Sequence, residues 1–150
     1  MEHFPSTLSR AESDALFSRI QAHIERHRFG LWAVEVRGGP AWIGFCGLSV
    51  PSFNAPFTPC VEVGWRLAAA HWGNGYATEA AAAVRDLAFT TWDRPYVISL
   101  IRPVNVSSQA VARRIGMTPT RPVEFHGYEH VVWRVERTSL PDGNPASGRG

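Results

Sequence analysis

The chain has 150 residues, of which 45% are hydrophobic and 19% are charged, values that are typical of one compact globular domain. The formal net charge of +2 and the lack of a long basic run argue against a nucleic-acid-binding protein. Two cysteines, Cys46 and Cys60, are too few for a disulfide framework or a metal cluster. No stretch reaches the roughly 20 apolar residues of a membrane span, and residues 1–5 do not resemble a signal peptide. We therefore expect a cytoplasmic protein with no membrane partner and no bound metal.

Apolar residues at helical spacing predict a first helix over residues 10–28. Ser9 or Ser13 can cap its start, and Gly30 follows its basic end as the expected stop. An alanine-rich helix is predicted over residues 78–92. Its expected buried positions are Ala81, Val84, Ala88 and Phe89.

Aromatic and β-branched residues predict five strands, over residues 31–36, 41–50, 61–67, 96–101 and within 125–136. A last helix is predicted over residues 105–115, before Gly116. The order of elements is helix, three strands, helix, strand, helix, strand, which indicates an α/β or α+β fold with a mixed sheet. We expect a single domain over residues 1–138 and a disordered tail over residues 139–150, which is rich in Pro, Gly and Ser.

Alternation along the third strand places Val61, Val63 and Trp65 on one face of the sheet and Glu62 on the other. Strand placement also predicts that Trp32 and Trp42 lie in the core.

A glycine-bearing loop over residues 71–78 joins the third strand to the alanine-rich helix, and this arrangement is typical of an anion site. Gly73 and Gly75 permit a positive φ and a close backbone approach, and Asn74 tolerates a left-handed conformation. A Walker loop is excluded because no Lys-Ser or Lys-Thr follows, and a dinucleotide fingerprint is excluded because the third glycine is missing. From the glycines alone, a helix-start turn without a ligand stays an alternative.

Four segments together carry a resemblance to a known family. They are Glu62-Val63-Gly64-Trp65-Arg66-Leu67, Trp72-Gly73-Asn74-Gly75-Tyr76-Ala77-Thr78-Glu79-Ala80, Asn105-Val106-Ser107-Ser108 and Ile115-Gly116-Met117. The chain resembles, over about residues 13–136, the GNAT superfamily of acetyl-CoA-dependent N-acetyltransferases, in the branch named for ribosomal-protein alanine and serine N-acetyltransferases. The resemblance implies a mixed, mostly antiparallel central sheet with helices on both faces, without the family's first strand and first helix.

The resemblance also implies a site for acetyl-CoA. Backbone amides of Gly73, Asn74, Gly75, Tyr76, Ala77 and Thr78 would hold the pyrophosphate. The backbone of Trp65, Arg66 and Leu67 would pair with the pantetheine arm and present an N–H to the thioester carbonyl. Asn105 matches the family's asparagine that contacts pantetheine. The Tyr76 side chain would touch the cofactor or pack on the sheet.

Two residues are candidates for proton transfer. Glu62 is the candidate general base, and the alternative is a strand carboxylate that faces solvent or pairs with Arg66 or Arg102. Many relatives carry a tyrosine as the acid for the leaving thiolate where this chain has Ala112. In this branch that role often falls on the serine of N-x-x-S, here Ser108, whose alternative role is a helix cap.

The expected function is transfer of an acetyl group from acetyl-CoA to a primary amine, either a protein N-terminus or a small molecule. The alternative is a catalytically degenerate module that binds CoA or a partner. Trp65 or Phe53 would line the acceptor pocket, and His130 would lie near it or on the surface. A homodimer that covers an open sheet edge is also expected.

Overall fold

The computed structural model describes residues 9–39, 42–51, 55, 58–68, 71–125 and 127–139. Phe53 and the predicted tail from residue 140 onward lie outside the described residues. The described strands form one six-stranded sheet in the order β1-β2-β3-β4-β6-β5. The strands are β1 (Leu31–Val34), β2 (Gly44–Ser49), β3 (Glu62–Leu67), β4 (Tyr96–Ile101), β5 (Thr118–Phe125) and β6 (Tyr128–Glu136). Only the pairing of β3 with β4 is parallel, so the expected mixed, mostly antiparallel sheet is confirmed.

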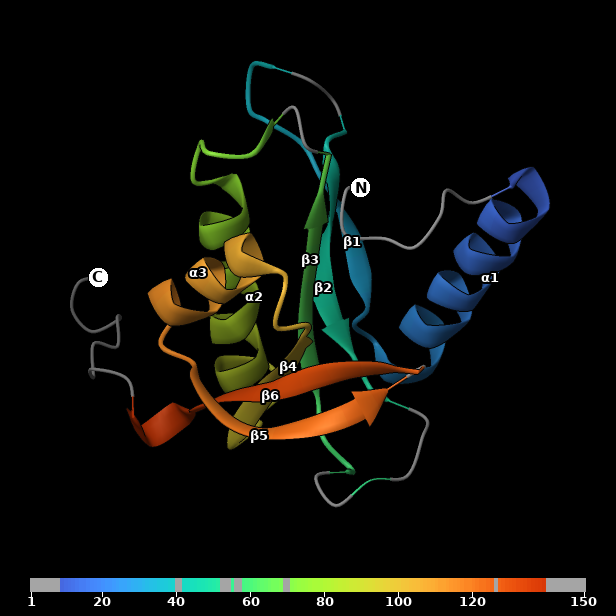
Figure 1. Ribbon diagram of the computed structural model, residues 1–150. Coiled ribbons are helices and arrows are strands. Elements are labelled where there is room, and N and C mark those ends of the chain that lie inside the picture. The colour runs from blue at the N-terminus through green and yellow to red at the C-terminus, as the bar shows by residue number, and fades with distance from the viewer. Residues whose placement is uncertain are drawn as a thin grey trace.

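The helices cover both faces of the sheet (Figure 1). Helices α2 (Tyr76–Thr90) and α3 (Val106–Arg114) lie on one face, and α1 (Arg10–His27) lies on the other. A short 3-10 helix, η2 (Arg137–Ser139), follows β6. None of the helices in these described segments is long and apolar enough to cross a membrane.

The main core lies between the sheet and the helices α2 and α3. Alternate residues of β3 and β4, among them Val63 and Val97, point into it and are fully buried. The buried residues of α2 are Ala81, Val84, Ala88 and Phe89, as the helical spacing predicts. A smaller cluster of Cys60, Ile98 and Val132 lies on the opposite face of the sheet.

The predicted start of α1 is confirmed, and its predicted stop is wrong. Ser9 and Glu12 form a reciprocal capping box, with Glu12 N donating to Ser9 Oγ at 3.0 Å and Ser9 N donating to Glu12 Oε1 at 2.8 Å. The helix ends at Arg28, in the left-handed conformation at φ 68°, so the expectation that Gly30 is the stop is wrong. The N–H of Arg28 still reaches Ile24 O, at 2.7 Å, which is how the helix closes without a glycine.

The strand β5 was missed in the sequence, and the predicted order of elements therefore lacks one strand. Pro119 and Pro122 interrupt the strand signal in this segment. Both are tolerated because β5 is an edge strand, which pairs only with β6 and has a register shift between Pro119 and Arg121.

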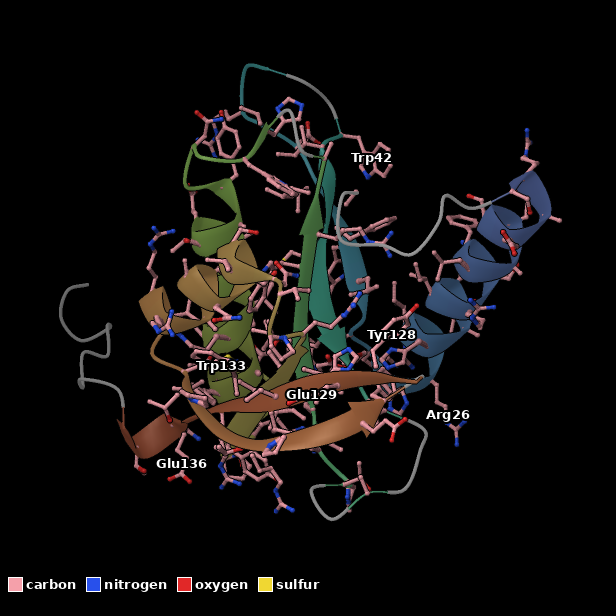
Figure 2. The ribbon with its side chains drawn as sticks, viewed as in Figure 1. Arg26, Trp42, Tyr128, Glu129, Trp133 and Glu136 are labelled. Atoms are coloured by element: carbon pink, nitrogen blue, oxygen red, sulfur yellow. The ribbon has the colours of Figure 1, made fainter. Side chains whose placement is uncertain are left out.

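The tryptophan prediction fails for one residue. Trp42 is 56% exposed and precedes β2, with its ring edge-to-face against Phe45 at 5.6 Å between centroids. Trp32 and Trp65 are half-buried against the main core, as expected of strand residues. Trp133 of β6, which is labelled in Figure 2, is buried. The guanidinium carbon of Arg113 lies over its ring, 5.1 Å from the ring centroid.

Candidate active site

The parallel backbone pairing between β3 and β4 is limited to the start of β3. The two strands share one register pair, Glu62 with Ile98, and Ile98 N donates to Val61 O at 3.0 Å. Beyond this point side chains bridge the strands, with Ser99 Oγ donating to Val63 O at 3.0 Å. Backbone groups of alternate residues point to the same neighbouring strand, so the N–H groups of Trp65 and Leu67 face the opening between the diverging strands.

The loop after β3 delivers backbone donors to this opening. Gly73 and Gly75 have positive φ values of 84° and 80°, which a side chain would strain. Gly75 is the N-cap of α2, and no side chain caps the helix there among the residues described. The first N–H groups of α2 thus have no intrahelical partner and, with the helix dipole, favour an anion. Asn74 is not left-handed, and its amide contacts the carbonyls of its own loop at 3.4 and 3.5 Å.

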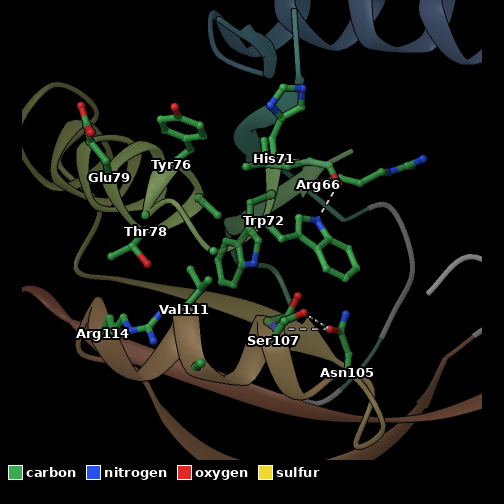
Figure 3. Close-up of a pocket in the computed structure, with 17 residues that line it drawn as sticks. Arg66, His71, Trp72, Tyr76, Thr78, Glu79, Asn105, Ser107, Val111 and Arg114 are labelled. Carbon is green, nitrogen blue, oxygen red and sulfur yellow. Dashed lines mark hydrogen bonds between the residues drawn. The ribbon is translucent and has the colours of Figure 1, made fainter. Parts of the chain in front are cut away.

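A large cavity of about 720 Å³ runs from this loop along α3. Nine of the ten sequence-predicted cofactor residues line it: Trp65, Arg66, Leu67, Gly73, Gly75, Tyr76, Ala77, Thr78 and Asn105. Asn74 is the predicted residue that does not. Thr78 of α2 and Arg114 of α3 lie at one end of the cavity, and Asn105 and Ser107 lie at the other (Figure 3).

A small cavity of about 270 Å³ adjoins the large one. Its walls include Leu16 and Ile20 from α1, Phe45 from β2 and Glu62 from β3. Four residues line both cavities and mark their junction: Trp65, Arg66, Asn105 and Ser108. The indole Nε1 of Trp65 is buried and has no hydrogen-bond partner within the described part of the chain. His130 lines neither cavity; its Nδ1 lies 2.9 Å from Tyr128 O, and its ring packs edge-to-face on Phe125.

Glu62 is the acidic residue of the small cavity. Its Oε2 accepts a hydrogen bond from Leu100 N at 3.3 Å. Burial raises the pKa of the Glu62 carboxyl to about 7, and the hydrogen bond from Leu100 opposes this only in part. A carboxyl that titrates near neutrality exchanges protons readily at physiological pH, as a general base must.

Asn105, and not Ser108, caps the start of α3. Asn105 is the N-cap, and its Oδ1 accepts hydrogen bonds from Ser108 N at 3.1 Å and from Ser107 Oγ at 3.2 Å. The Ser108 hydroxyl therefore does not cap the helix, and the capping alternative for it is wrong. Asn105 and Ser108 both line the junction of the two cavities, and each carries a polar side-chain group there.

Seven residues that line the large cavity were not predicted as site residues: His71, Trp72, Glu79, Ser107, Ala110, Val111 and Arg114. His71 and Trp72 come from the loop, where Trp72 Nε1 donates to Leu67 O at 2.9 Å and ties the loop to the end of β3. Arg114 comes from α3 and shares a helix face with Ser107 and Val111. That spacing is a sequence signal for Arg114, because it follows the N-x-x-S segment at helical intervals.

The chain matches a family model and a curated protein over part of its length. A family model described as the acetyltransferase (GNAT) domain matches residues 1–118. The chain is 40% identical over 87 residues to YkkB, an uncharacterized protein of Bacillus subtilis strain 168. That match covers 58% of this chain and 49% of YkkB, so the chain spans about half the length of this curated relative.

Solved structures share the architecture. An acetyltransferase from Agrobacterium tumefaciens strain C58 is 31% identical, with a TM-score of 0.73 over 89% of this chain and 75% of that protein. RimJ from Mycobacterium smegmatis, solved in complex with CoA-disulfide, is 20% identical, with a TM-score of 0.72 over 93% of this chain and 69% of RimJ. At that identity RimJ supports the likeness of fold alone.

Proposed function

Since the chain belongs to the GNAT acetyltransferase family, we propose that it transfers an acetyl group from acetyl-CoA to a primary amine, without a metal. One observation carries the proposal. The large cavity, with its backbone donors and Arg114, meets the small cavity of Glu62 at the opening between β3 and β4.

The residues of the large cavity fit acetyl-CoA. The N–H groups of residues 76–78 at the start of α2 suit the pyrophosphate, since an anion satisfies donors that the helix leaves free. Arg114 adds a positive charge for a phosphate group at the same end of the cavity. The N–H groups of Trp65 and Leu67 and the amide of Asn105 suit the amide groups of the pantetheine arm. When bound, acetyl-CoA supplies an activated acyl group as a thioester.

Each catalytic residue has one proton to move. In the transfer the amine nitrogen forms the new C–N bond, the C–S bond breaks, and the acetyl group passes directly to the amine. Glu62 accepts the proton that the amine gives up, directly or through a water. Ser108, at the junction of the cavities, donates its hydroxyl proton to the departing thiolate and regains one from solvent water, while Glu62 releases its proton to solvent. A backbone N–H of residues 65–67 stabilises the negative charge on the carbonyl oxygen.

The cofactor site is tested by calorimetric titration with acetyl-CoA. Gly75→Glu places bulk and negative charge at the N-terminus of α2, and we expect it to abolish the micromolar binding of the wild type. Gly127→Glu is the matched control, because Gly127 is exposed, has the same φ of 80° and a Cβ there meets no atom within 4 Å, as at Gly75. Wild-type protein that is folded yet does not bind would overturn the proposal.

Turnover separates the enzyme from the degenerate module. Release of free thiol from acetyl-CoA, saturable in an added amine, supports the enzyme. Tight binding of acetyl-CoA with no turnover of any amine would favour the degenerate module. Ala112 motivates this alternative, because many relatives carry the acidic tyrosine at that position.

A further inference from the structure

The walls of the small cavity are mostly apolar. Leu16 and Ile20 stand one helical turn apart on α1, and both line the cavity. Leu31 and Phe45 add apolar surface from β1 and β2. A ligand with a hydrophobic body fits these side chains best, because their contact removes apolar surface from water on both sides.

The charges of the small cavity suit a single ammonium group. Glu62 is the one carboxylate among its described lining residues, and Arg66 is the one cation. Burial lowers the pKa of the Arg66 guanidinium to about 10, so the group is still charged at neutral pH. A second ammonium on the ligand would find no further carboxylate among these described lining residues.

Size and position restrict the ligand further. The volume of about 270 Å³ lies just below the range of roughly 300–1,000 Å³ in which drug-sized ligands bind. Asn105 and Ser108 are among the residues that line both cavities, so the reacting nitrogen belongs at that end of the small cavity.

We propose that the acetyl acceptor is a small primary monoamine with an apolar body, bound with its nitrogen beside Glu62 and its body against Leu16, Ile20 and Phe45. This inference rests on the proposed acetyltransferase function and narrows its substrate class. It excludes polyamines and peptides as preferred acceptors, since a polyamine brings further charge, and a peptide brings its polar backbone, against the apolar walls.

The test compares kcat/KM for phenethylamine with that for spermidine and for an alanyl peptide, at saturating acetyl-CoA. We expect phenethylamine to exceed both by about tenfold or more, the discrimination typical of an apolar pocket. Ile20→Glu adds a second carboxylate to the wall and should lower kcat/KM for phenethylamine and raise it for spermidine. Phe17→Glu is the matched control on the same helix, because Phe17 is 60% exposed and does not line the cavity, and it should leave the ratio unchanged.

The outcomes separate this inference from the proposed function. Preference for spermidine or the peptide, or an Ile20→Glu ratio equal to that of wild type, would overturn the inference and leave the acetyltransferase function intact. If no amine turns over, calorimetric binding of phenethylamine to the CoA-saturated protein decides. Binding that Ile20→Glu weakens supports the assigned cavity, and no binding overturns the inference.

Discussion

The carboxylate of Glu62 takes the place of a backbone rung between β3 and β4. Leu100 N lies on β4, where the parallel ladder would continue, and donates to Glu62 Oε2 at 3.3 Å. The carboxylate thus satisfies a backbone donor at the point where the strands diverge. The same side chain lines the small cavity. Glu62 therefore both bonds β4 at the point where the strands diverge and provides the proposed base.

Glu62→Gln should lower kcat by about 10²–10⁴-fold, the usual contribution of a general base. The amide keeps an oxygen that can accept from Leu100 N, so the opening is preserved. Only the ionised carboxylate accepts a proton, and its pKa is raised to about 7, so wild-type activity should rise as the pH increases through about 7. The pH–rate profile of the variant should lack that rise, while its acetyl-CoA affinity stays near the wild-type value. A variant with the wild-type profile would remove Glu62 from the mechanism.

Ser108→Ala and Asn105→Ala separate proton donation from helix capping. Ser108→Ala should reduce kcat by about tenfold or more and leave the free energy of unfolding nearly unchanged, because its hydroxyl does not cap α3. Asn105→Ala should lower the free energy of unfolding by about 1 kcal/mol, because it removes the cap that accepts from Ser108 N. Steady-state kinetics and urea denaturation measure the two effects. The assignment of Ser108 fails if its variant loses stability and keeps kcat.

Arg114→Ala should raise the Kd for acetyl-CoA by about tenfold or more, since a charge-assisted hydrogen bond to a phosphate contributes roughly 1.5–3 kcal/mol. Its neighbour Arg113 provides the control, because that guanidinium lies over the Trp133 ring, 5.1 Å from its centroid, and not in the large cavity. Added salt should weaken binding to the wild type more than binding to Arg114→Ala. Equal losses in both variants would indicate a general charge effect.

His23 links α1 to the residues that flank the sheet through two hydrogen bonds. Its replacement should weaken the packing of α1, which contributes Leu16 and Ile20 to the small cavity. Val50 N donates to His23 Nε2 at 2.9 Å, which requires a neutral ring whose Nδ1 donates to Phe29 O at 3.0 Å. His23→Phe should lower the free energy of unfolding by about 1–3 kcal/mol, because the Val50 N–H loses its partner. His130→Phe is the control, since within the described part of the chain that ring bonds only to Tyr128 O of its own hairpin, and a change within about 0.5 kcal/mol is expected. Urea denaturation measures both, and equal effects would contradict the role given to His23.

Much of the fold follows from local signals in the chain. The helical period gave the buried face of α2, the apolar run gave β4 at its observed limits, and the glycine loop gave the turn before α2. Signals that depend on neighbours failed. The prolines of β5 hid an edge strand, and Trp42 was placed in the core because a residue's exposure depends on what packs beside it.

The sequence by itself determined which residues could bind an anion and which strand carries Glu62, because glycine conformation, helix starts and strand alternation act over a few neighbouring residues. Only the tertiary structure decided that the ladder between β3 and β4 stops, since Glu62 meets Leu100 from 38 residues away. It also decided that α1 forms one wall of the small cavity. These relationships arise from packing between segments that are distant in the sequence, and local periodicity does not predict such contacts.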